Sequence, residues 1–107
     1  RIEHRVAGAD SSPYLTVAAL LAGINLGIDR QCEAPPPISG NAWVEDAANV
    51  CLPGHMAEAI ARFSESANVR ETLSAEFQFA FSEVKKQELA EFERRVTDFE
   101  LETYLSA

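Results

Sequence analysis

The longest uncharged apolar stretch of the chain, residues 15–28, constrains the fold more than any other feature. Ser12 can cap a helix that begins at Pro13, because proline at the first helical position loses no hydrogen bond. We therefore predict a helix from about residue 13 to residue 29. Its apolar side chains cover nearly the whole circumference, which indicates burial inside something larger. It also carries a stripe of small residues that would let another backbone approach closely: Ala19, Gly23 and Gly27.

Composition and charge restrict the class of protein. The 107 residues are 47% hydrophobic and 24% charged, which suits one soluble domain and is too hydrophobic for disorder. The formal net charge of -8 disfavours nucleic acid and anionic membranes as partners. The uncharged apolar stretch is also shorter than the ~20 residues that a membrane-spanning helix needs, so we expect no such helix. Cys32 and Cys51 match no zinc or disulfide pattern, and no signal peptide is visible, so we expect reduced thiols in a cytoplasmic protein.

The first six residues show the alternation that is typical of a strand. Arg1, Glu3 and Arg5 recur with a period of two and so share one face of the predicted strand. The rest of the sequence offers no second strand to pair with it. Because an unpaired strand leaves its backbone donors and acceptors unsatisfied, the pattern indicates a sheet whose other strands lie outside this chain.

The remainder of the chain is predicted to be a long loop over residues 31–53 followed by helices. An amphipathic stripe marks the first of these helices, formed by Met56, Ala59, Ile60 and Phe63.

Two capping patterns divide the C-terminal part. Asn68 with Glu71 predicts the start of a short element, and Thr97 with Glu100 predicts the start of a last helix. A longer helix is expected between them, over about residues 75–96. Taken alone, the segment is predicted to be mainly α, with one N-terminal strand and four to five helices.

The strand face formed by Arg1, Glu3 and Arg5 is the one group of residues with clear chemical potential. Two guanidinium groups that flank a carboxylate can hold two anionic groups and one divalent cation. This combination suits phosphoryl transfer, in which arginine neutralises developing charge and a carboxylate holds the metal. The alternative is a solvated strand face with a ladder of surface ion pairs, which are common and contribute little.

The same residues open a longer segment that resembles the glutamine synthetase family. Residues 1–15 are similar to the family's R-[IL]-E-x-R segment, which is followed by Pro-Tyr-Leu. Further similarity lies in the helix after Ala18, in Gly40-Asn41, in Leu52-Pro53 and in residues 92–105, so the resemblance covers all 107 residues. The sequence of residues 3–10 is most similar to those of the family branch that makes γ-glutamyl amides from glutamate and polyamines. Members that use ammonia remain an alternative.

The resemblance implies a role for each of the three charged residues. Arg1 would contact the nucleotide phosphate of ATP, Glu3 would bind Mg²⁺ or Mn²⁺, and Arg5 would hold glutamate through its reacting carboxylate. The implied reaction is ATP-dependent formation of γ-glutamyl phosphate, followed by attack of ammonia or an amine. We expect Arg1 and Arg5 to be catalytic in the full-length parent.

The resemblance also implies that residues 1–107 are the C-terminal segment of an α+β catalytic domain. We expect this segment to be inactive alone, to require the remainder of the parent chain, and to belong to a homo-oligomer. A different class of function is the alternative, namely a non-catalytic oligomerisation or interaction module derived from the same family.

Overall fold

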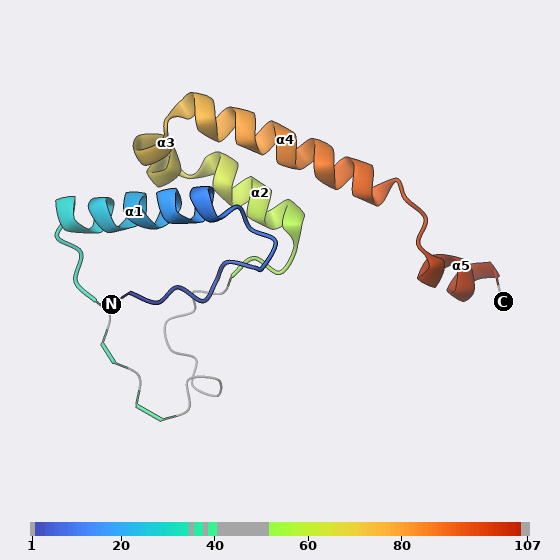
Figure 1. The fold of residues 1–107 in the computed structure, drawn as a ribbon, viewed down its shortest axis with the longest axis horizontal. Coiled ribbons are helices and arrows are strands. Elements are labelled where there is room, and N and C mark those ends of the chain that lie inside the picture. The colour runs from blue at the N-terminus through green and yellow to red at the C-terminus, as the bar shows by residue number, and fades with distance from the viewer. Residues whose placement is uncertain (1, 35, 38, 41–51, 106–107) are drawn as a thin grey trace.

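The computed structural model describes residues 2–34, 36–37, 39–40 and 52–105. These residues form five helices: α1 (Pro13–Asp29), α2 (Met56–Glu65), α3 (Ala67–Leu73), α4 (Ala75–Glu93) and α5 (Asp98–Leu105). Helices α2 and α3 both pack against α4, and α1 packs against α3 (Figure 1). Helix α5 lies apart, beyond the C-terminal end of α4. The predicted helical content is therefore confirmed for the described part of the chain.

The predicted N-terminal strand is wrong for this structure. Residues 2–6 lie in neither a helix nor a strand, and no strand occurs among the described residues. A strand is defined by its ladder of hydrogen bonds to a neighbour, and the described residues offer no neighbouring strand. Arg1, at the start of the predicted strand, lies outside the described residues.

Helix α1 has the predicted limits and is exposed or half-buried along its length. It begins at Pro13 after Ser12, whose backbone carbonyl accepts from Thr16 N at 3.0 Å, although the Ser12 side chain makes no capping hydrogen bond. No residue of α1 is buried. Leu21, for example, keeps 56% of its surface exposed. Within this chain the described residues cover only part of α1, so its burial inside a larger structure stays a prediction.

The end of α1 is fixed by backbone hydrogen bonds and one long side chain. Gln31 adopts a positive φ of 50°, and the following Cys32 N–H donates to the Gly27 carbonyl at 2.9 Å. Arg30 then reaches α3, where its Nη1 donates to Asn68 Oδ1 at 2.9 Å and its Nη2 to Glu71 Oε2 at 2.6 Å. This pair of bonds connects α1 to α3.

Those bonds also correct the predicted start of the short element. Helix α3 is capped by Ser66, whose Oγ accepts from Val69 N at 3.2 Å, and not by Asn68. Asn68 and Glu71 lie one turn apart on α3, so both can accept from the same arginine. The capping-box pattern of the sequence therefore marks a contact between helices in the structure.

The core lies between α2 and α4. Ile60 of α2 is 7% exposed, as its place in the predicted amphipathic stripe requires. Phe63 of α2 contacts Phe81 of α4, with ring centroids 5.2 Å apart, and Phe77 stacks on Phe81 at 5.6 Å. The tilted contact between Phe63 and Phe81 stabilises the α2–α4 pair beyond the area that it buries, while the Phe77–Phe81 stack lies within α4.

A buried glutamine joins the three helices α2, α3 and α4. Gln78 is 3% exposed, and its Nε2 donates to the carbonyls of Phe63 at 2.7 Å and Ser66 at 2.8 Å. Its Oε1 accepts from Arg70 Nε at 3.1 Å. Because both polar ends of the buried amide are satisfied, this residue holds the junction of α2 and α3 against α4.

The last helix begins as the sequence predicts. Glu100 Oε2 accepts from both Thr97 N, at 2.8 Å, and Thr97 Oγ1, at 2.9 Å, while Glu100 N donates to Thr97 Oγ1 at 3.3 Å. The reciprocal bonds define a capping box. The preceding helix α4 ends at Glu93, three residues before the predicted limit at 96.

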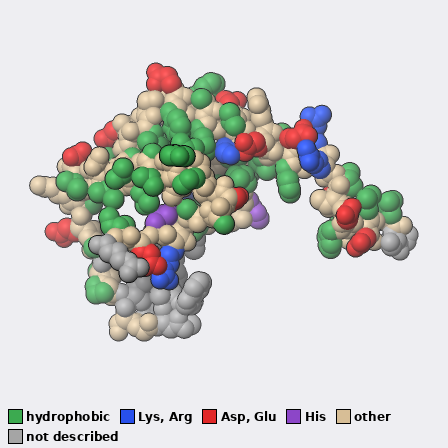
Figure 2. Space-filling view, in the orientation of Figure 1, with side chains coloured by type: hydrophobic (Ala, Val, Ile, Leu, Met, Phe, Trp, Pro, Cys, Tyr) green, Lys and Arg blue, Asp and Glu red, His purple; other side chains and the backbone are tan. Residues whose placement is uncertain are grey.

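Hydrophobic side chains remain visible over much of the surface. They gather over α1 and the neighbouring helices and again over α5 (Figure 2). Phe79 and Phe92 of α4 are each 69% exposed, and Phe99 of α5 is 74% exposed. Among the described residues, none of the helices is both long enough and apolar enough to cross a membrane.

Candidate functional site

The structure brings together two of the three predicted site residues. Arg5 Nε donates to Glu3 Oε1 at 2.7 Å, forming an ion pair in which the Arg5 side chain is 82% exposed and that of Glu3 is 52% exposed. Alternate residues of an extended segment lie on the same side of the backbone, which allows this contact without a sheet. The predicted role of Arg1 concerns a residue outside the described range.

The pair leaves most of its ligand-binding capacity free. Arginine has five N–H donors, and the bond to Glu3 uses only the one on Nε. Glu3 has a second carboxylate oxygen that can bind a cation. Since exposed ion pairs contribute only about 0–1 kcal/mol, either partner can exchange its contact for a ligand at small cost. The geometry therefore suits an anion on Arg5 and a divalent cation on Glu3.

Glu3 can supply a single carboxylate to such a cation. Within the described residues, no group of three or more His, Cys, Asp or Glu side chains could enclose a metal ion. Mg²⁺ is commonly bound by one or two carboxylates together with water and substrate phosphates. The residue fits a metal site of that open kind, whose other ligands would come from the substrates and from other parts of a protein.

A short turn connects the Glu3–Arg5 pair to α1. Ser11 N donates to the Gly8 carbonyl at 3.1 Å, and α1 starts two residues later at Pro13. A side chain at position 8 would crowd this turn, because an added Cβ would lie 2.7 Å from Asp10 Oδ1. The turn and helix α1 thus carry the segment that holds the two candidate ligands.

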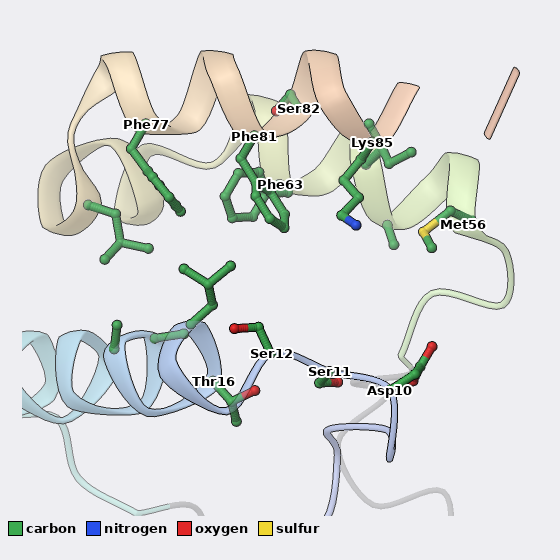
Figure 3. Close-up of a pocket in the computed structure, with 16 residues that line it drawn as sticks. Asp10, Ser11, Ser12, Thr16, Met56, Phe63, Phe77, Phe81, Ser82 and Lys85 are labelled. Atoms are coloured by element: carbon green, nitrogen blue, oxygen red, sulfur yellow. The ribbon is translucent and has the colours of Figure 1, made fainter. Parts of the chain in front are cut away.

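An apolar groove of about 660 Å³ lies between α1 and the helices α2 and α4 (Figure 3). Ser12 and Thr16 line its α1 side, while Phe63 and Phe81 line the opposite side. Lys85 also lines the groove and is already bonded to Glu88 Oε2 at 2.6 Å. Apolar side chains make up most of the lining, and the polar residues lie mainly in the turn before α1 and on α4, so the groove suits packing against apolar groups.

No sequence pattern predicted this groove. A signal for it was present, because α1 is apolar around its circumference while α4 carries aromatic residues one turn apart at Phe77 and Phe81. Which two apolar surfaces face each other across a groove cannot be deduced from periodicity, because periodicity indicates a buried face but not its partner.

The two carboxylates with a lowered pKa, Glu76 and Glu100, lie at the starts of helices. Backbone hydrogen bonding at its own position, and then the Ser74 hydroxyl, lowers the pKa of Glu76. The Thr97 N–H, and then the Thr97 hydroxyl, lowers the pKa of Glu100. Both carboxylates are exposed on the first turn of a helix. These shifts therefore reflect helix capping and give no sign of acid–base catalysis.

Comparison with known proteins defines the class to which this chain belongs. The family model described as "Glutamine synthetase, catalytic domain" matches residues 1–104. The chain therefore belongs to the glutamine synthetase catalytic-domain family of carbon–nitrogen ligases.

Its similarity to individual relatives is of the same order in several organisms. It is 35% identical over 105 residues to gamma-glutamylputrescine synthetase of Escherichia coli, with 98% of this chain and 22% of that protein covered. It is 36% identical over 101 residues to gamma-glutamylethanolamide synthetase of Streptomyces coelicolor, covering 94% of this chain and 21% of that protein. Glutamate–isopropylamine ligase of a Pseudomonas species is 34% identical, with 98% and 23% covered.

The chain thus spans about a fifth of the length of these three curated relatives. No solved structure matches it. The match at residues 1–104 includes the Glu3–Arg5 segment, all of α1 and nearly all of α5.

Proposed function

We propose that residues 1–107 are the C-terminal segment of the catalytic domain of an ATP-dependent ligase that joins glutamate to an amine through a γ-glutamyl phosphate. The observation that carries this proposal is the family match over residues 1–104. The preference for an amine rests on three relatives at 34–36% identity whose names specify putrescine, ethanolamine or isopropylamine products or substrates. Ammonia is the alternative acceptor, since glutamine synthetases at 27–34% identity also match.

Within that ligase, the Glu3–Arg5 pair forms one wall of the active site. Arg5 binds the reacting carboxylate of glutamate with the planar donor group that its single bond to Glu3 leaves free. Glu3 provides a carboxylate oxygen to Mg²⁺ or Mn²⁺. The bound ion supplies charge neutralisation for the phosphates of ATP. Arg1 contributes a guanidinium to the nucleotide phosphate and completes the trio.

The remainder of the ligase is also required for activity. The open coordination of Glu3 and the exposed apolar surface of α1 both require groups from elsewhere in the protein. The 107-residue chain alone is therefore inactive, and the parent is a cytoplasmic homo-oligomer that binds ATP, glutamate and its amine. The same exposed surface favours a second candidate, an interaction module without catalysis, which activity of the full-length protein would exclude.

Kinetics of the full-length ligase test the assigned roles. Glu3→Gln keeps the size of the side chain and removes its charge, so the Mg²⁺ requirement should rise and kcat should fall. Arg5→Lys keeps the charge and loses the planar donor group, so KM for glutamate should rise about tenfold, which equals ~1.4 kcal/mol of binding, while KM for ATP stays near normal.

Two exposed residues provide matched controls. Arg94→Lys, just after the end of α4, and Glu102→Gln, in α5, make the same chemical changes at positions that carry no proposed ligand. We expect both to retain wild-type constants. Wild-type constants for Mg²⁺, ATP and glutamate in the Glu3 and Arg5 variants as well would overturn the assignment. Rates with ammonia, putrescine, ethanolamine and isopropylamine would identify the acceptor.

A further inference from the structure

We draw no further inference here: the strongest candidate, the apolar groove between α1 and the helices α2 and α4, carries none because nothing in the described part of the chain shows what covers it.

Discussion

Helices α2, α3 and α4 form a packed unit, whereas residues 2–29 are only exposed or half-buried. The packed unit holds the buried residues Ile60, Gln78 and Ser82, while α1 has none. The difference does not come from hydrophobicity, because α1 is the most apolar helix of the chain. It comes from the position of the partners. Single residues, Ser66 and Ser74, connect α2 to α3 and α3 to α4, so these helices meet their partners within a few turns of chain.

Substitution of the core isoleucine is expected to have the largest effect and to show whether the two regions differ in stability. Ile60→Ala should reduce the free energy of unfolding of the packed unit by about 3 kcal/mol, through lost burial and the cavity that remains. Leu21→Ala is the control on α1, where the side chain is 56% exposed, and should cost less than about 1 kcal/mol. Urea unfolding followed by circular dichroism would measure both. Equal losses would show that α1 is packed as closely as α2.

Removal of the buried amide should have the next largest effect. Gln78→Ala removes donors from two backbone carbonyls and leaves Arg70 without its acceptor, which should cost about 2 kcal/mol of stability. Gln78→Glu keeps an acceptor for Arg70 but cannot donate to the carbonyls, so at pH 7 it should be at least as harmful. Gln87→Ala, on the exposed side of α4, is the control and should change stability by no more than about 0.5 kcal/mol. A harmless Gln78→Glu would show that donation to the carbonyls is unimportant.

A glycine of α1 should respond in the opposite direction. An added Cβ at Gly23 meets nothing within 4 Å, so Gly23→Ala in the 107-residue chain should stabilise α1 by about 1 kcal/mol through helix propensity alone. The expected result is greater helicity by circular dichroism and an unfolding transition at a higher temperature or urea concentration. Ala22→Gly, the reverse change at the adjacent position, should weaken the helix by a similar amount. Loss of helicity in Gly23→Ala would reveal a close neighbour on this face of α1 within the chain.

The smallest expected effect concerns the pH dependence of α5. Because hydrogen bonds from Thr97 lower the pKa of Glu100 in the folded chain, the box contributes stability above the unfolded pKa of about 4.3. That contribution should decline as the pH falls through the lower folded value. Carbon-13 NMR of the Glu100 carboxyl and of the α5 backbone would follow both events. Thr97→Ala removes the hydroxyl but keeps the backbone N–H, so it should raise the pKa of Glu100 only partly. No change in that pKa would contradict the contribution of the hydroxyl.

Local signals predicted the helices well. Pro13 marks the start of α1 as its first residue, although the Ser12 side chain makes no capping bond. The Thr97–Glu100 box marks the start of α5, because capping depends on residues within one turn. The stripe that includes Ile60 also predicted the buried side of α2. Asn68 and Glu71 gave the wrong cap, since the same two side chains can bind a distant arginine as readily as a nearby N–H.

The candidate site was predicted in part. The period of two placed Glu3 and Arg5 on one side of the backbone, and the structure brings them to 2.7 Å. The same period also predicted a strand, which residues 2–6 do not form in the structure. A strand depends on hydrogen bonds to residues far away in sequence or outside the chain, and a local period cannot supply them.

The sequence by itself determined where α1 and α5 begin, which face of α2 is apolar, and to which ligase family the chain belongs. Each of these depends on residue types at short, fixed spacings. Only the tertiary structure decided that Gln78 joins three helices, that Arg30 connects α1 to α3, and that a groove separates α1 from α2 and α4. These features depend on how helices are placed relative to one another. That placement follows from packing between residues that are far apart in sequence, which no local pattern predicts.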